Sequence, residues 1–220
     1  MSKVIVFEGI SGSGKSFLID KVMLKSPQSQ MIKWFDNEYS IDLLSGIQKD
    51  IPVSHDFFSV CYAMDFYGKY KYRILPALEK TDLILHRYIY TPLSHDLARG
   101  TDSRLLNRLY KAQDFLEPDL IVYMDTAPET AYERIIRTRK PSFYECGLDS
   151  FMFNDLDQAK QDFKNGKFSE NELKEYYLEF QSKVSDNYSE VLKGKSNVLR
   201  VKPDNNIDEC ADCILSRIGE

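Results

Sequence analysis

The chain has 220 residues, of which 43% are hydrophobic and 29% are charged, as in an ordinary soluble globular protein. This composition excludes a disordered chain, a collagen-like chain and a disulfide-rich scaffold. The formal net charge is −5, so we expect no nucleic acid as the main partner. No apolar run reaches the roughly 18 residues of a membrane span and no secretory signal is recognisable, so we expect a cytoplasmic protein with no membrane partner.

Short apolar runs bounded by turn formers or polar residues are typical of buried strands. Five such runs are Val4–Phe7, Met31–Phe35, Leu83–Leu85, Leu120–Met124 and Val198–Val201. Segments with helical spacing lie between them. The alternation predicts an α/β fold with a five-stranded, mostly parallel sheet and helices on both faces, typical of P-loop NTPases once the motif below is added.

Apolar residues recur at helical spacing in five segments. The predicted helices cover residues 57–67 behind a Ser54 cap, 105–116, 128–136, 169–192 behind a capping box, and 207–218. In the first of them, the apolar residues fall on one stripe of the helix. Its members are Phe57, Val60, Cys61, Met64 and Tyr67.

Residues 140–167 differ from the rest of the chain. They are polar, rich in Asp and Phe, and show little periodicity, with Pro141, Gly147 and Gly166 among them. Such a stretch is typical of a functional or disordered loop, and we interpret it as a lid. The expected organisation is one domain over residues 1–220, with residues 137–168 as a lid or insert segment.

The segment Gly9–Ser16 matches the pattern G-x-x-x-x-G-K-[ST]. Glycines let the backbone curl around an anion with its N–H groups inward, and the start of the next helix favours phosphate. Lys15 is expected to reach the β- and γ-phosphates of ATP, and the Ser16 hydroxyl to hold Mg²⁺. The residues expected to form this cofactor site are Gly9, Ser11, Gly12, Ser13, Gly14, Lys15 and Ser16.

Basic side chains follow at two further places. Arg87 closes the third apolar run, where it points to the catalytic edge of a parallel sheet. Arg134, Arg137, Arg139 and Lys140 cluster where the fourth helix gives way to the lid. Cations at a helix end can simply complement its dipole, but a group entering a lid also suits a clamp on a transferring phosphate.

The chain resembles the thymidylate kinase and deoxynucleoside kinase group of P-loop kinases. The resemblance rests on Phe7-Glu8-Gly9 with the P-loop, on Pro76-Ala77-Leu78 ahead of Arg87-Tyr88, and on the block from Pro118 to Arg134. It implies a kinase that moves the γ-phosphate of ATP to a small-molecule acceptor, a (deoxy)nucleoside monophosphate, with dTMP as the first expectation. A homodimer packed through helices is also implied.

The resemblance further implies roles for single residues. Arg87 would hold the acceptor phosphate or the transferring group, and Arg137 and Arg139 would close over ATP, with Arg134 beside the nucleotide. Tyr62 stands where the family stacks a ring on the acceptor base, although it could equally be a core aromatic. On the same side we expect Phe66, at the family's base-reading arginine position, and Tyr144 in the insert, which could also be solvated.

The chain departs from the family pattern on the acceptor side. His86 replaces an expected Asp, Ser11 replaces a P-loop Asp, and Gly12 stands where some members carry an arginine. Asp125 could take over a magnesium contact, but a helix-capping role is the favoured interpretation. Residues 34–38 replace the usual Arg-Glu-Pro-Gly segment. The acceptor is therefore less well defined than the donor.

Glu8 keeps a second hypothesis open. In deoxynucleoside kinases the corresponding glutamate is the general base on a 5′-hydroxyl, whereas a phosphate acceptor needs only charge neutralisation. Glu8 could instead be a buried residue that ties the P-loop to neighbouring backbone. The alternatives are therefore a deoxynucleoside kinase or a kinase of another small molecule, and a non-catalytic P-loop protein, which His86 would suit.

Overall fold

A computed structural model describes residues 2–33, 54–111, 115–150, 156–202 and 206–219. The predicted Trp34–Glu38 departure lies outside these residues. Among the helices described, none is long and apolar enough to cross a bilayer.

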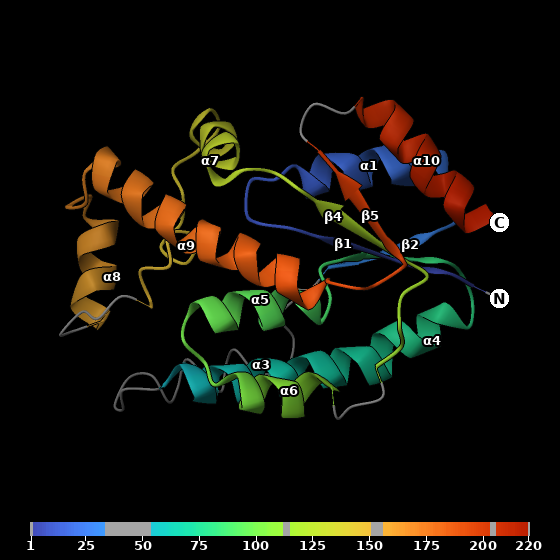
Figure 1. Cartoon of the computed structure of the whole chain (residues 1–220), viewed down its shortest axis with the longest axis horizontal. Coiled ribbons are helices and arrows are strands. Elements are labelled where there is room, and N and C mark those ends of the chain that lie inside the picture. Colours follow the sequence, from blue (N-terminus) through green and yellow to red (C-terminus); the bar gives the residue numbers. More distant parts are fainter. Residues whose placement is uncertain (1, 34–53, 112–114, 151–155, 203–205, 220) are drawn as a thin grey trace.

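The centre of the molecule is a parallel sheet in the order β2-β3-β1-β4-β5 (Figure 1). Its strands are β1 (Val4–Glu8), β2 (Gln30–Lys33), β3 (Leu83–His86), β4 (Leu120–Met124) and β5 (Val198–Val201). All four pairings are parallel, so the carboxyl ends of the strands meet at one edge. β1 and β4 are buried at every position, which explains their continuous apolar runs. The predicted α/β class is confirmed.

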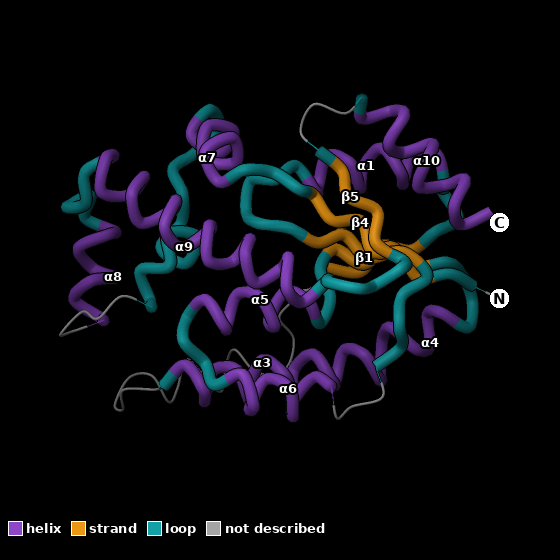
Figure 2. Tube along the Cα trace, viewed as in Figure 1, coloured by secondary structure: helices purple, strands orange, loops and turns teal. Residues whose placement is uncertain are grey.

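Helices cover both faces of the sheet (Figure 2). On one face, α1 (Lys15–Lys25) and α10 (Ile207–Gly219) pack together over a smaller core. The opposite face carries the larger core. The helices that contribute to it are α3 (His55–Lys69), α5 (Tyr90–Ala98), α6 (Ser103–Lys111), α7 (Pro128–Ile136), α8 (Leu156–Lys164) and α9 (Glu170–Val191), with a π-helical segment η1 (Tyr70–Ile74) leading to α4 (Leu75–Leu78).

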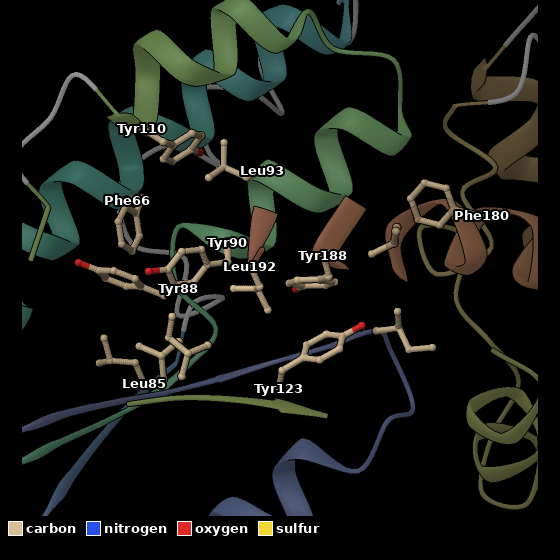
Figure 3. Close-up of a cluster of buried hydrophobic side chains, with 14 of the residues drawn as sticks. Phe66, Leu85, Tyr88, Tyr90, Leu93, Tyr110, Tyr123, Phe180, Tyr188 and Leu192 are labelled. Carbon is tan, nitrogen blue, oxygen red and sulfur yellow. The ribbon is translucent and has the colours of Figure 1, made fainter. Parts of the chain in front are cut away.

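Buried tyrosines join the helices of the larger core to the sheet. Figure 3 shows Tyr123 of β4 and Tyr188 of α9 facing each other, with ring centroids 5.4 Å apart. Tyr88, at the end of β3, lies in the same cluster and donates its hydroxyl to the Leu116 carbonyl at 3.0 Å. A buried tyrosine needs a partner for its hydroxyl. Polar groups are therefore carried into the core directly beside the strand ends.

The apolar stripe of α3 does not face the core. Phe57, Val60, Met64 and Tyr67 are exposed, Met64 to 56%, and Cys61 alone of the stripe is buried. The helix instead turns inward the face of Ser59, Ala63 and Phe66, which Tyr70 of η1 continues. Ser59 donates to Asp96 Oδ2 of α5 at 2.9 Å, so part of the contact is polar and leaves no apolar pattern in the sequence.

Three other helix predictions need correction. α6 ends at Lys111, so Phe115 and Leu116 do not belong to it. Residues 140–167, predicted as a loop, contain the helix α8. The helix α5 was not predicted, because Pro92 interrupts the pattern, although proline is well tolerated in a first helical turn. The capping box of Ser169 and Glu172 is confirmed at the start of α9.

Residues 141–150 pack against α9. Phe143, Cys146 and Leu148 are buried there, and Gly147 has a φ of 63°. A Cβ atom on Gly147 would lie 2.3 Å from Cγ of Phe180, so no larger residue fits without displacing that ring. The close approach of Gly147 thus fixes this segment on the helix.

We expect Gly147→Ala to lower the free energy of unfolding by about 1–3 kcal/mol from overpacking, in addition to the strain of a left-handed alanine. Gly166→Ala is the matched control, because Gly166 has a φ of 71° and a Cβ added to it would meet no atom within 4 Å. Urea unfolding of both variants measures the difference. Equal losses would show that the Phe180 contact contributes nothing.

Candidate active site

The loop between β1 and α1 lies at the carboxyl edge of the sheet. Gly9, Gly12 and Gly14 have φ values of 137°, 75° and 96°, which side chains rarely adopt. A Cβ atom on Gly12 would lie 2.6 Å from the Ala131 carbonyl oxygen of α7. The loop can therefore curl with its amides inward, and α7 leaves no room for an arginine at position 12.

Side chains from two helices hold this loop from behind. Arg134 of α7 donates from Nη1 to the Ser13 carbonyl at 3.0 Å. From α9, the Tyr177 hydroxyl donates to the Ser11 carbonyl at 2.6 Å, and the Gln181 Oε1 accepts from the Ser11 amide at 3.3 Å. Arg134 thus supports the loop backbone through a hydrogen bond, and its side chain lies beside the expected nucleotide site.

Lys15 lies inside the curled loop. Its Nζ donates to the carbonyls of Gly9 and Ile10, at 2.8 and 2.7 Å, and to Ser13 Oγ at 3.1 Å. Burial lowers the pKa of Lys15 well below its usual value, and the nearby positive charge of Arg87 lowers it further. An anion in the loop would give this ammonium a stronger partner than neutral oxygens.

Arg87 directly follows β3 in a strained conformation. Its φ is 77°, which costs a non-glycine residue roughly 1–2 kcal/mol. The side chain is buried, and Nη1 contacts Thr91 Oγ1 at 3.1 Å, the Tyr188 hydroxyl at 3.1 Å and His95 Nε2 at 3.3 Å. Backbone strain of this kind persists only where surrounding contacts fix the conformation, and it is concentrated at active sites and ligand-binding sites.

Glu8, the last residue of β1, is completely buried. Its Oε1 accepts from the Tyr88 amide at 2.8 Å, and its Oε2 accepts from the hydroxyls of Thr91 at 2.6 Å and Tyr188 at 2.8 Å. Burial raises the pKa of Glu8, while Arg87 and these hydrogen bonds act in the opposite direction. The carboxylate is thus engaged with α5 and α9.

His86 is the last residue of β3 and pairs with Phe7 of β1 and Lys33 of β2. Burial lowers its pKa to about 3, with further lowering by the charges of Arg87, Lys15 and Lys33. The imidazole is therefore neutral at physiological pH. It supplies no negative charge where the family places a carboxylate.

The arginines expected to form the lid differ in their surroundings. Arg139 forms a two-pronged ion pair with Glu145, each contact at 2.7 Å. Burial raises the pKa of Glu145, but Arg139 and Ser142 lower it to a net value below normal. Arg137 is exposed, and its guanidinium makes no hydrogen bond or ion pair with any residue the structure describes. Its charge is therefore available without breaking a side-chain contact.

The expected acceptor-side residues fall into two environments. Tyr62 of α3 is half-buried, and burial raises its pKa, with Arg99 and Tyr144 among the groups close enough to act on it. Tyr144 accepts at its carbonyl from Arg99 Nη2 at 3.4 Å. Phe66, by contrast, is 3% exposed and packs against Tyr88 in the larger core.

Sequence reasoning missed four residues of this region. Thr91 and His95 of α5 and Arg99, its C-cap residue, follow Arg87 at intervals of four residues, and Tyr188 comes from α9. Arg99 pairs with Asp149 at 2.7 Å and so ties α5 to the 141–150 segment. The four-residue spacing after Arg87 was visible in the sequence, but no local signal pointed to Tyr188.

The described residues include no cluster of three or more metal-binding side chains. Ser16, in the first turn of α1, is exposed, and its hydroxyl makes no hydrogen bond to the described part of the chain. Such a hydroxyl fits Mg²⁺ that takes its other ligands from phosphates and water. Asp125 does not cap α7, because the N-cap residue of that helix is Ala127. Oδ2 of Asp125 lies 3.7 Å from Nη1 of Arg200.

Comparison with known proteins agrees with this arrangement. The family model described as thymidylate kinase matches residues 7–164. The chain belongs to the thymidylate kinase family. This thymidylate kinase family member is a P-loop phosphotransferase of the nucleoside monophosphate kinase class, with ATP as phosphate donor.

Proteins with thymidylate kinase names from three organisms are similar to this chain over most of its length. A "Probable thymidylate kinase 2" from Saccharolobus solfataricus is 28% identical over 223 residues, which is 99% of this chain and 95% of the relative. A "Probable thymidylate kinase" from Sulfolobus acidocaldarius is 24% identical over 217 residues, 95% and 92% of the two chains. Another from Archaeoglobus fulgidus is 27% identical over 153 residues, 64% and 74%. The predicted family and enzyme class are thereby confirmed.

Proposed function

We propose that the protein transfers the γ-phosphoryl group of ATP to dTMP. The observation that carries the proposal is that two cations, Lys15 of the P-loop and Arg87, follow the adjacent parallel strands β1 and β3, with the Arg87 amide donating to the Phe7 carbonyl at 3.0 Å. Two phosphate-bearing substrates need positive charge on both sides of the transferring group. The names of the relatives support dTMP as the acceptor.

In this proposal the P-loop amides and Lys15 hold the β- and γ-phosphates, and Arg134 keeps the loop in shape. Ser16 would hold Mg²⁺, which neutralises charge on the phosphate oxygens when it is bound. Arg87 binds the acceptor phosphate, Tyr62 lies against the acceptor base, and Tyr144 borders the same space. His86, being neutral, leaves the cationic character of the site undiminished.

The surroundings of Glu8 favour a phosphate acceptor over a hydroxyl acceptor. A general base must reach the proton it removes, but both Glu8 oxygens already accept hydrogen bonds and the residue has no exposed surface. An anionic acceptor needs no base. The nucleoside kinase alternative therefore has less support than the nucleotide kinase.

ADP release from Mg·ATP with dTMP, thymidine and the other deoxy- and ribonucleoside monophosphates tests this proposal. We expect turnover with dTMP well above every other acceptor. Turnover with thymidine alone would replace the proposal by a nucleoside kinase. ATP binding without turnover on any acceptor would support the non-catalytic alternative.

We further propose that residues 137–168 act as the lid of a single domain, with Arg137 and Arg139 closing over ATP. Arg137→Ala is then expected to lower kcat on the order of tenfold or more while KM for ATP changes little, because the contact forms in the transition state. Arg108→Ala, which removes an exposed cation of α6, is the control. Steady-state kinetics decide, and a rise in KM at constant kcat would mark Arg137 as a ground-state contact.

We also propose a homodimer that forms through the exposed apolar face of α3. The face consists of Phe57, Val60, Met64 and Tyr67, which lie on one side of the helix. A contiguous apolar patch of this kind is typical of an association surface. Light scattering should give twice the chain mass, and Met64→Glu should shift the protein toward monomer.

A further inference from the structure

The hydroxyls of Thr91 and Tyr188 lie between two buried opposite charges. Thr91 Oγ1 and the Tyr188 hydroxyl each donate to Glu8 Oε2, at 2.6 and 2.8 Å. Each of these oxygens also lies 3.1 Å from Arg87 Nη1. Since a hydroxyl has one hydrogen, donation to Glu8 turns the lone pairs of both oxygens toward the guanidinium.

These two hydroxyls separate the Glu8 carboxylate from the Arg87 guanidinium, so the two charges form no direct ion pair. A carboxylate that meets an arginine directly tends to take up two of its N–H groups. Here the hydroxyls of Thr91 and Tyr188 lie between Glu8 and Arg87, and among the described residues they contact Nη1 of the guanidinium. Nε and Nη2 of Arg87 form no hydrogen bond with the residues the structure describes. These two N–H groups form one edge of the guanidinium, which can therefore face a phosphate.

His95 completes the set of Nη1 partners. Its Nε2 lies 3.3 Å from Nη1, and its ring meets Tyr188 edge-on, with centroids 6.1 Å apart. Burial and the neighbouring cations Arg87, Arg99 and Lys15 lower the pKa of His95, so the ring is neutral and can accept at Nε2. The three atoms around Nη1 are thus uncharged acceptors that share its two hydrogens.

We propose that Thr91 and Tyr188 are positioning residues, oriented by Glu8, that hold Arg87 with the edge formed by Nε and Nη2 directed at the phosphate of the acceptor nucleotide. The proposal rests on the proposed function, because it takes the acceptor phosphate as the ligand of Arg87. It assigns Glu8 a role through hydroxyls instead of a role as general base. It also explains why Arg87 tolerates a strained backbone, since three partners fix its side chain.

Two variants remove one hydroxyl each while keeping the shape of the side chain. We expect Thr91→Val and Tyr188→Phe each to lower kcat/KM for dTMP about tenfold, with KM for ATP changed less than twofold, because hydrogen bonds to a charged group are involved. Thr91→Ser keeps the hydroxyl and should retain activity within about threefold. Tyr123→Phe is the matched control, since its hydroxyl lies 3.5 Å from Ser185 and touches neither Glu8 nor Arg87.

Guanidinium NMR gives a readout that does not depend on turnover. Restricted rotation should give Arg87 separate Nη signals in the wild-type protein, assigned by their loss in Arg87→Lys, and these signals should merge in Thr91→Val and Tyr188→Phe but not in Tyr123→Phe. Separate signals in all variants, or an equal loss toward ATP and dTMP, would overturn the proposal. Absence of dTMP turnover in wild type with this NMR pattern intact would refute only the proposed function.

Discussion

Replacing Lys15 by methionine is expected to lower kcat about 10²–10³-fold, the cost of losing one preorganised charge on the transferring phosphoryl group. Methionine approaches lysine in length, so the loop keeps most of its packing. The change also leaves the carbonyls of Gly9 and Ile10 without the donor they now have. Coupled ADP-release kinetics with Mg·ATP and dTMP measure the effect.

The control for this variant is Lys21→Met. Lys21 lies in the same helix, is partly exposed and pairs with Asp208 on α10, away from the P-loop. The Lys21→Met variant should keep kcat within twofold of the wild-type value, because surface ion pairs contribute little to stability. If Lys15→Met also turned over at the wild-type rate while folded by circular dichroism, the P-loop mechanism would be wrong.

Arg87→Lys is expected to reduce kcat/KM for dTMP by a factor on the order of 10² while leaving KM for ATP nearly unchanged. Lysine keeps the charge but lacks the planar fork that can bind Thr91, Tyr188 and a phosphate at the same time. The result separates geometry from charge. Steady-state kinetics with each substrate varied in turn provide the measurement, and parallel losses for ATP and dTMP would place Arg87 on the donor side instead.

The sheet and the P-loop could be predicted because both are encoded locally. Five apolar runs gave the five strands, and Gly9–Ser16 carries its glycines and its lysine at fixed spacing. The start of α9 was predicted for the same reason, since a capping box lies within four residues. Patterns of this kind need no knowledge of distant parts of the chain.

The polar network around Arg87 could not be predicted because its members are far apart in sequence. Tyr188 is 180 residues from Glu8 and 101 from Arg87, yet contacts both. In the sequence it is one more aromatic on the apolar stripe of a helix. The orientation of α3 could not be predicted for a related reason. Periodicity identifies an apolar face but does not say whether the core or a partner covers it.

In the proposed mechanism, the P-loop and Arg87 together move a phosphoryl group from ATP to dTMP. A ³¹P NMR time course of the protein with Mg·ATP and dTMP tests it most directly, because each phosphate of each product has its own signal. We expect ADP and dTDP to form in equal amounts, with no accumulation of inorganic phosphate. Inorganic phosphate and ADP without dTDP, or no change in the spectrum of a folded, ATP-binding protein, would contradict the claim.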